Sequence, residues 1–526
     1  MLALRRSLDF LQHGAWPEVL GAAVLLGALA ACGRGIHHAG NVLERSVVQV
    51  AIPRDPAMLN PLISETEDEF SIEAAIFDGL LKFDSNGRLI PDLAVAVPSR
   101  TNGGISADFS TITYHLRRSV VWQDGSPFTS GDVAFTYRML ISDRVASPLR
   151  SSYEQIASLE APSPFIVVVQ LRKPSLAAIS QIFVAGEGFI VPEHVLRHVD
   201  DIHRALFNAS PVGTGPFSVY RWKRGDDIQL VANDRYFGGR PRVRGLRLRI
   251  VPDADTRSQL VATGAVDLAA VAPGAVSSLA SVPGIRIVQG RTTDVFYLDL
   301  NTRRAPLDDR AVRDALASAI DREQVVSALA GRAQIANSLM PHVFRFPCIG
   351  DRRPHALLER PGGKLHLEIT YAAAARMDGV ALALQQMWKS IGVDATLRAL
   401  PFALLYGERG VVATGRYEVA IDGLGVATPG DIAPIIGTNN APPNGFNFSR
   451  YANANVDRWL AMADATDDER ERARLYAHVQ DTLCRDAPVI PLFWRKYTYA
   501  FSSRLHGFAP EPITSDLWNV AVWSLQ

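Results

Sequence analysis

Cysteine is scarce in this chain, and neither sign of charge is in excess. The 526 residues contain three cysteines, and 54 Lys and Arg balance 54 Asp and Glu, which gives a formal net charge of zero at pH 7. Three cysteines are too few for a disulfide scaffold, and none stands in the C-x-x-C pairs of zinc ribbons or thioredoxin-like centres. A chain without net positive charge lacks the electrostatic footprint of a nucleic-acid binder. We therefore expect no nucleic-acid partner.

Motifs of catalysis and metal binding are also absent. No Gly-x-Ser-x-Gly elbow, Walker loop or His-Glu-x-x-His sequence occurs, so hydrolase and nucleotide-binding chemistry have no anchor. His194 and His198 are spaced for one face of a helix, but no third metal ligand is in step with them. The sequence predicts neither an enzyme, nor a metal site, nor a cofactor.

The apolar run near the N-terminus is too short to cross a membrane. It covers residues 19–31, whereas a spanning helix needs about 20 residues. Arg5 and Arg6 precede it and small residues end it, which is the layout of a secretory signal. Residues 1–31 are therefore predicted to be a signal peptide that exports the rest of the chain.

The end of this run, LAACG at residues 29–33, resembles a bacterial lipobox, which is cleaved before a cysteine that then carries acyl chains. Cys32 is the predicted lipidation site, and residues 32–45 are the predicted tether. Each buried methylene of an acyl chain adds roughly 0.8 kcal/mol, so two or three chains anchor a protein durably. The alternative is an ordinary signal peptide with a chance cysteine. Either way we expect a location in the periplasm or cell envelope, in the first case as a membrane-anchored lipoprotein.

Lipidation of Cys32 leaves Cys348 and Cys484 as the other thiols. Outside the cytoplasm the surroundings are oxidising, which favours a disulfide between them. Two separate buried thiols are the alternative, because sequence does not supply the geometry that pairing requires.

Strand and helix patterns alternate along the rest of the chain without an internal repeat. Alternating or continuous apolar residues predict strands at residues 47–52, 111–116, 166–171 and 246–251. Helical spacing of apolar residues predicts helices at residues 71–83, 310–330 and 467–483. The predicted fold class is α/β with mixed sheets.

Several short motifs occur in an order that resembles one protein family. They include Asn60-Pro61-Leu62, Asp78-Gly79-Leu80-Leu81, Pro91-Asp92-Leu93-Ala94, Trp122-Gln123-Asp124-Gly125, Gly213-Thr214-Gly215-Pro216, Asp308-Asp309-Arg310 and Pro491-Leu492-Phe493. Together they resemble the extracytoplasmic solute-binding proteins of bacterial ABC importers, in the class of dipeptide, oligopeptide and nickel binders. The resemblance covers about residues 46–510.

The resemblance implies a two-lobed periplasmic-binding-protein fold, type II-like, with a hinge between the lobes and an extra inserted domain. The implied boundaries are residues 46–90, 212–299 and 503–526 for lobe I, 91–211 for the inserted domain and 300–502 for lobe II. Two of the motifs have structural readings of their own. Trp122 to Gly125 predicts a hairpin tip packed by the tryptophan, and Gly213 to Gly215 predicts backbone angles that other residues resist.

The resemblance also implies where a ligand is held. On the first lobe the predicted contacts are Phe77 and Asp78, and on the hinge they are Phe296, Tyr297, Asn301 and Trp494. Because side chains alternate along a strand, either Phe296 and Leu298 or Tyr297 and Asp299 face the ligand. Core packing is the alternative role for each aromatic side chain.

The second lobe departs from the family pattern. Family peptide binders carry a Gly-Trp pair and then an aspartate that binds the peptide's α-amino group, and here the corresponding loop has neither the tryptophan nor the aspartate at that place. A buried ammonium without a counter-charge is costly, so Asp422 or Asp431 would have to replace it. Thr428 is a further predicted contact in this loop, and capping of a helix near Ile432 is the alternative role of Asp431.

These observations predict a monomeric, lipid-anchored binding protein that captures an oligopeptide or peptide-like solute and delivers it to an ABC permease. One alternative is a non-peptide solute, such as a sugar, an opine-like compound or a metal chelate, which the missing aspartate supports. Another is a partner protein in signalling or the envelope that has left transport.

Overall fold

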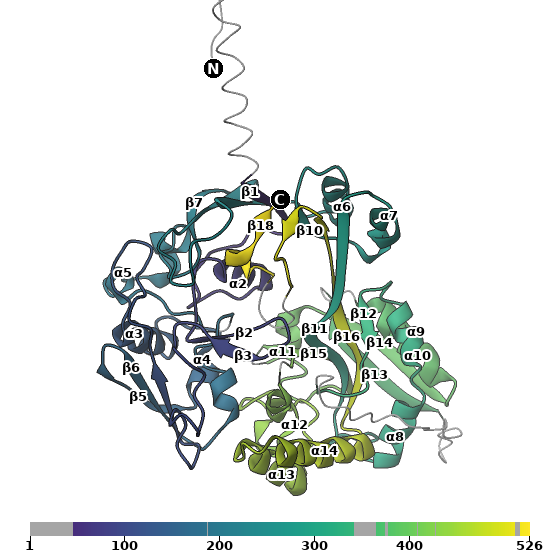
Figure 1. Cartoon of the computed structure of the whole chain (residues 1–526). Coiled ribbons are helices and arrows are strands. Elements are labelled where there is room, and N and C mark those ends of the chain that lie inside the picture. The colour runs from purple at the N-terminus through teal and green to yellow at the C-terminus, as the bar shows by residue number, and fades with distance from the viewer. Residues whose placement is uncertain are drawn as a thin grey trace, which may run out of the picture. The chain divides into compact units, whose positions relative to one another are not determined.

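The computed structural model describes residues 46–186, 188–340, 364–373, 377–407, 409–426, 428–510 and 516–526 (Figure 1). The predicted signal peptide, Cys32 and the tether lie outside the described residues, and so does Cys348. The sulfur of Cys484 is disulfide-bonded, and its partner is not among the described residues, so the pairing with Cys348 stays a prediction. Within the described ranges, no helix has both the length and the apolar character needed to cross a membrane.

Eleven of the described strands form one mixed sheet, which confirms the predicted α/β class. Ten follow the order β14-β13-β15-β11-β16-β10-β1-β9-β8-β7, and β12 pairs with β16. In that order, their bounds are Val393–Leu400, Leu365–Ala372, Val419–Gly425, Ile285–Leu300, Val489–Ser502, Leu268–Ala270, Val47–Ile52, Gly245–Ile250, Asp227–Ala232 and Phe217–Lys223, with β12 at Ala333–Ile335. The pairs β1–β10, β13–β14 and β13–β15 are parallel.

Smaller sheets and helices complete the described chain. The other strands are β4 (Thr111–His115), β6 (Ile166–Leu171) and β5 (Ile156–Ser163) in one sheet, β2 (Leu81–Phe83) with β3 (Leu89–Pro91), and β17 (Leu505–His506) with β18 (Ser524–Leu525). The α-helices are α2 (Glu67–Glu73), α3 (Ser130–Leu140), α4 (Arg150–Tyr153), α5 (Glu193–Leu196), α6 (Ala254–Ala262), α7 (Val276–Ala280), α8 (Arg310–Ser318), α9 (Arg322–Ser327), α10 (Asp378–Lys389), α11 (Phe402–Tyr406), α12 (Ala433–Ile436), α13 (Ala454–Asp464) and α14 (Glu469–Asp486). The 3₁₀ turns are η1 (Ala177–Ser180), η2 (Ile202–Arg204), η3 (Leu206–Asn208), η4 (Pro273–Ala275), η6 (Pro429–Ile432), η7 (Thr438–Asn440) and η8 (Val520–Val522).

Two long strands, β11 and β16, connect the halves of the large sheet (Figure 1). They pair antiparallel from Ile285 with Ser502 to Asp299 with Val489. Along β11, the segment that pairs with β15 is residues 294–300. Along β16, the segment that pairs with β10 is residues 499–501. We call β11 and β16 the ribbon, the strands from β10 to β7 the first half, and β15, β13 and β14 the second half. Two halves joined by a narrow ribbon are the arrangement expected of lobes that move about a hinge.

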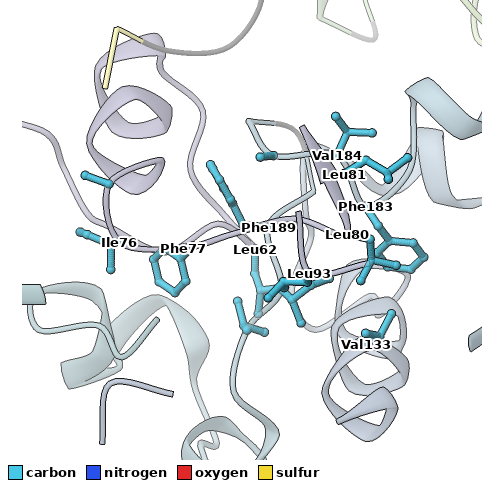
Figure 2. Close-up of a cluster of buried hydrophobic side chains, with 14 of the residues drawn as sticks. Leu62, Ile76, Phe77, Leu80, Leu81, Leu93, Val133, Phe183, Val184 and Phe189 are labelled. Carbon is cyan, nitrogen blue, oxygen red and sulfur yellow. The ribbon is translucent and has the colours of Figure 1, made fainter. Parts of the chain in front are cut away.

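The hydrophobic core is divided in the same way. One large cluster of buried side chains belongs to the first half and to the segments that pack on it, and Figure 2 shows part of it around Phe77, Leu80 and Phe183. In the second half, Leu298 packs in a cluster with Trp388 of α10, while its neighbour Tyr297 packs in another with Val479 of α14. Since successive strand residues point to opposite faces, helices cover both faces of the second half. The predicted domain boundaries stay a prediction.

The predicted strands are confirmed, but two of the helix predictions are wrong. The helix expected at residues 71–83 begins earlier, where Thr66 and Glu69 form a capping box, and ends at Glu73. Beyond Glu73 the chain bonds elsewhere, because the Ile76 carbonyl accepts a hydrogen bond from the Gly215 N–H (2.8 Å). The helix expected at residues 310–330 is divided into α8 and α9, since the Asp321 side chain caps a new helix. The helix expected at 467–483 is present as α14.

The hairpin tip at Trp122 is confirmed. Its indole is completely buried and meets the Phe128 ring edge-on, with 6.0 Å between the ring centroids. The Gly125 N–H donates to the Trp122 carbonyl (2.8 Å), and Gly125 has φ +92°, which a residue with a side chain adopts only under strain. Tryptophan and glycine here therefore have structural roles.

Candidate functional site

A cavity of about 570 Å³ lies between segments that are far apart in the sequence. One side comes from residues 83–109 and 176–180, which include β2, β3 and η1. The other comes from residues 428–476, which include the loop after β15 and the helices α13 and α14. Pockets of about 300–1,000 Å³ are typical of small-molecule sites. The volume and the two-sided lining make this cavity the candidate ligand site.

Charged side chains line the cavity on both sides. Arg88 and Arg100 belong to the first side, and Asp464, Asp467, Glu469 and Arg472 belong to the second. The Arg100 guanidinium forms an ion pair with Asp467 at 3.2 Å. A solute with separated positive and negative groups matches such a lining, because each group meets charge of the opposite sign.

Asp464, the last residue of α13, binds the two sides of the cavity to each other. Its carboxylate accepts hydrogen bonds from the Ser175 hydroxyl (2.9 Å) and the Ala177 N–H (3.0 Å), and its carbonyl accepts one from the Leu176 N–H (2.9 Å). Burial raises the pKa of this carboxyl, although the donated hydrogen bonds act against the rise. A second contact of this kind runs from Gln181 to Asp431 (3.4 Å). These hydrogen bonds hold the two walls of the cavity against each other in the structure.

The loop after β15 contains two of the predicted ligand contacts, Thr428 and Asp431. Thr428 lines the cavity. Asp431 accepts a hydrogen bond from the Thr428 N–H (2.7 Å) and completes a capping box at the start of η6. The alternative role of Asp431, capping, is therefore present, and ligand contact by either residue stays a prediction. The family aspartate would fall within residues 425–427, of which Ala427 lies outside the described residues.

Asp422 and Gly423, at the end of β15, have neighbours within the protein. Asp422 accepts hydrogen bonds from the Tyr406 hydroxyl (2.9 Å) and the Gly423 N–H (2.8 Å). A Cβ at Gly423 would lie 2.8 Å from the Phe296 ring. The space that small residues open in this loop is thus filled by Phe296, which stacks on Phe493 with 4.8 Å between the ring centroids.

Asp422 belongs to a pair of carboxyl groups. Asp299 of β11 is completely buried, and neither of its oxygens has a hydrogen-bond partner among the described residues. Burial, and then the charge of Asp422, raises the pKa of Asp299 well above its usual range. Burial also raises the pKa of Asp422 to about 6. At least one of the two carboxyl groups therefore keeps its proton at a pH where an exposed aspartate is ionised.

The other hinge residues predicted from the resemblance are mostly interior. Tyr297 and Trp494 are each only 1% exposed and belong to the same hydrophobic cluster. The Asn301 amide donates to the carbonyls of Gly415 and Tyr417, both at 3.0 Å. Of the predicted ribbon residues only Phe296 is half-buried. Ligand contacts by these side chains stay predictions, and in this state the packing occupies most of their surface.

Phe77 and Asp78 are buried in the segments that pack on the first half. The Phe77 ring packs on Phe189 (Figure 2), with 6.2 Å between the ring centroids, and on Phe207, with 6.0 Å. The Asp78 carboxyl accepts hydrogen bonds from the hydroxyls of Thr214 (2.8 Å) and Tyr236 (3.3 Å). Burial, followed by the charge of Asp92, raises the pKa of Asp78 to about 8. The two residues are placed to stabilise the core, and a ligand contact by either of them is untested.

The comparisons with known proteins agree with this geometry. Residues 88–445 match the model of the bacterial extracellular solute-binding proteins, family 5. The chain belongs to this family. The glutathione-binding protein GsiB of Salmonella choleraesuis (strain SC-B67) is 27% identical over 531 residues, which cover 96% of this chain and 98% of the relative. The oligopeptide-binding protein AppA of Bacillus subtilis (strain 168) is 24% identical over 499 residues, 90% of each chain.

Solved structures confirm the family 5 fold. The structure of AppA in complex with a nonapeptide has a TM-score of 0.71 at 23% identity and covers 91% of this chain and 98% of its own. The structure of NikZ from Campylobacter jejuni in complex with Ni(L-His) has a TM-score of 0.70 at 24% identity, with coverages of 91% and 99%. Family 5 proteins bind solutes and are not enzymes, so the expectation of a binding protein of ABC importers is confirmed.

Sequence reasoning missed most of the charged residues that line this family 5 cavity. The sequence predicted residues 467–483 only as a helix, yet Asp467, Glu469 and Arg472 line the cavity. Asp464 carries no motif either. The available signal was the cluster of acidic residues around the start of a helix, and that pattern alone does not distinguish a cavity wall from a solvated surface.

Proposed function

We propose that this family 5 protein captures an oligopeptide or peptide-like solute in the cavity and delivers it to the permease of an ABC importer. The observation that carries the proposal is the charge of the cavity, with arginines on its first side and mainly carboxylates on its second. A peptide at neutral pH has an ammonium and a carboxylate group, so it matches both walls. The names of AppA and GsiB, an oligopeptide binder and a glutathione binder, support the same class of solute.

The cavity also offers a replacement for the missing family aspartate. Asp464, Asp467 and Glu469 place three carboxylates on the second side, close to the loop that would have carried it. Asp464 already binds the first side through Ser175 and Ala177, so we assign it to closure. Asp467 is likewise paired with Arg100 of the first side at 3.2 Å, so Glu469 remains to face a solute ammonium group.

The mechanism is a change in affinity between two arrangements of the walls. A solute that contacts both sides stabilises the arrangement in which Asp464 reaches Ser175, and the closed form is the one presented to the permease. No covalent bond is made or broken. One chain supplies both walls of the cavity, so capture of a solute needs no second copy.

The test is native mass spectrometry of the exported chain purified without refolding. We expect a ladder of peptide masses bound one per protein, which exchange for added peptide. A single non-peptide mass would replace the peptide proposal by the alternative of a metal chelate, opine-like compound or sugar; the missing aspartate favours that alternative, and NikZ shows the fold with a metal chelate. A protein without bound solute and without a thermal shift in a solute library would favour the partner-protein alternative.

We also propose that Cys32 carries the lipid anchor of the mature protein. Cys32→Ser removes the thiol that takes the first acyl chain, and the chains supply roughly 0.8 kcal/mol of membrane affinity per buried methylene. The expected result is that the wild type fractionates with membranes while Cys32→Ser is released into the soluble fraction. Cys348→Ser, which leaves the LAACG sequence intact, is the matched control. A Cys32→Ser chain that stays with membranes would refute the anchor.

A further inference from the structure

Arg291, on β11, has a guanidinium group without a counter-charge in the ribbon. The side chain is half-buried, and its guanidinium carbon lies 5.0 Å from the centroid of the Trp494 ring. Among the described residues, no carboxylate pairs with Arg291 and no acceptor takes a hydrogen bond from it. Its pKa is lowered, and burial is the sole cause. A guanidinium has five N–H donors, and the described residues accept a hydrogen bond from none of them.

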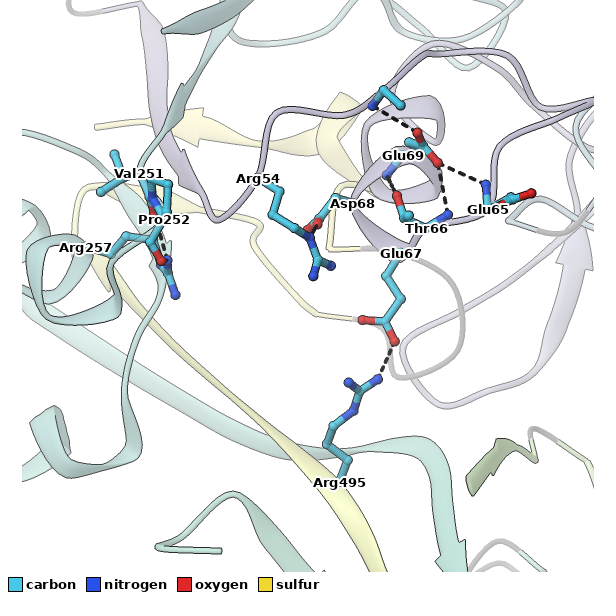
Figure 3. Close-up of polar contacts among 11 residues, drawn as sticks. Arg54, Glu65, Thr66, Glu67, Asp68, Glu69, Val251, Pro252, Arg257 and Arg495 are labelled. Carbon is cyan, nitrogen blue, oxygen red and sulfur yellow. Dashed lines mark hydrogen bonds and ion pairs between the residues drawn. The ribbon is translucent and has the colours of Figure 1, made fainter. Parts of the chain in front are cut away.

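The other arginines of comparable burial are satisfied, which makes Arg291 the exception. Arg257 donates to the carbonyls of Val251 and Pro252 (Figure 3) and to that of Ala270. Arg313 donates to the carbonyls of Leu307, Asp308 and Asp486. Arg495, on β16, forms an ion pair with Glu67 of α2 (Figure 3) and another with Asp294 of β11. Two carboxylates thus neutralise Arg495, whereas no described residue pairs with Arg291.

The backbone next to Arg291 contains an irregularity in the pairing of β11 with β16. The ladder between β11 and β16 shifts register between Arg291 and Val295, so the intervening residues leave regular pairing. Such bulges re-aim side chains and are frequent beside functional sites. The Thr293 carbonyl accepts a hydrogen bond from the Val426 N–H (2.9 Å), which attaches the bulge to the loop containing Thr428. Arg291 is therefore two residues from a direct contact with the loop that lines the cavity.

We propose that Arg291 binds a carboxylate group of the imported solute. The guanidinium lies over the Trp494 ring, and no described residue accepts a hydrogen bond from its N–H donors, so this planar fork of donors suits a bidentate carboxylate. The inference rests on the proposed function, because the carboxylate belongs to the captured solute. Both a C-terminal carboxylate and an Asp or Glu side chain of a peptide supply this chemistry.

The first experiment measures binding of peptides in matched forms. A library of short peptides with free and amidated C-termini is titrated by calorimetry into the wild type, Arg291→Gln and Arg291→Lys. We expect Arg291→Gln to weaken binding of the free acids by about 10- to 100-fold, as for loss of a hydrogen-bonded charged group. Arg291→Lys keeps the charge without the planar fork and is expected to recover part of the loss. Amidated peptides that keep affinity only when they contain Asp or Glu would identify a side-chain carboxylate as the group bound.

Arg286→Gln is the matched control. Arg286 is on the same strand, and its guanidinium carbon lies 5.3 Å from the centroid of the Phe501 ring, but the side chain is exposed. Its substitution removes the same charge and a similar ring contact, so we expect unchanged affinity. Equal affinities of Arg291→Gln and the wild type, with both folded by circular dichroism, would overturn the proposal.

A second experiment tests the site without any peptide. Phenylglyoxal labels arginines, and mass spectrometry of the digested protein reports the labelling rate at each position. We expect millimolar acetate, but not acetamide, to slow labelling of Arg291 several-fold relative to Arg286. Acetate protection in a protein that binds no peptide would refute peptide capture and keep the carboxylate site. Peptide binding without protection by acetate or by the bound peptide would keep peptide capture and refute the role of Arg291.

Discussion

Replacing Gly213 with alanine should destabilise the protein by roughly 3 kcal/mol or more, as an overpacked interior site does. A Cβ at Gly213 would lie 1.8 Å from the carbonyl oxygen of Ile76. That oxygen cannot retreat easily, because it accepts hydrogen bonds from the Gly215 N–H (2.8 Å) and from the Gln123 side chain (3.2 Å). The substitution therefore forces two backbone segments apart. The measurement is the urea midpoint of unfolding followed by circular dichroism.

Gly274→Ala is the control for this prediction. Gly274 is in η4, and a Cβ there would meet nothing within 4 Å. We expect it to change the free energy of unfolding by less than about 0.5 kcal/mol, as surface substitutions do. Equal urea midpoints for Gly213→Ala and Gly274→Ala would contradict the role assigned to the close approach.

Gly213 also shows what the sequence could and could not predict about the fold. The Gly-Thr-Gly motif was expected to need unusual backbone angles, yet neither Gly213 nor Gly215 has a positive φ. What demands glycine is the nearness of Ile76, a residue over a hundred positions away. The strands at residues 111–116 and 166–171 were predictable because their alternation is local. The helix expected at 71–83 was not, because hydrogen bonds to residues 215 and 217 replace its own.

The candidate site was harder to predict than the fold. Family motifs led to Phe77, Tyr297 and Trp494, which are side chains that the core occupies. Motifs that are common to a whole family mark shared packing, whereas a solute is recognised by side chains that differ between members. The cavity walls come from separate segments, and the charges on them, such as Arg100 and Asp467, pair only after folding. The spacing of residues along the chain does not predict which distant segments lie together in the fold.

The carboxyl pair yields the last prediction, that Asp299→Asn stabilises the protein above neutral pH. Ionised Asp299 would be a buried charge whose oxygens have no donor among the described residues, and an unsatisfied buried group costs about 1–3 kcal/mol, more when charged. Asparagine keeps the shape and carries no charge, so it removes the cost of an ionised carboxylate at this buried position. We expect a gain of about 1–3 kcal/mol in the free energy of unfolding at pH 8.

The pH dependence separates this effect from ordinary repacking. The folded-state pKa of Asp299 is raised by burial, so above the unfolded value of about 4 the folded state binds more protons than the unfolded state. Wild-type stability should therefore fall as the pH rises from about 4 through the raised pKa values of the pair, including that of Asp422 at about 6. Urea midpoints from pH 4 to pH 8 should show Asp299→Asn gaining on the wild type across this range and matching it near pH 4.

Asp308→Asn, at an exposed position, should follow the wild-type profile. A gain for Asp299→Asn that is the same at every pH would mean that asparagine improves the packing and that the protonation of Asp299 has no part in the gain.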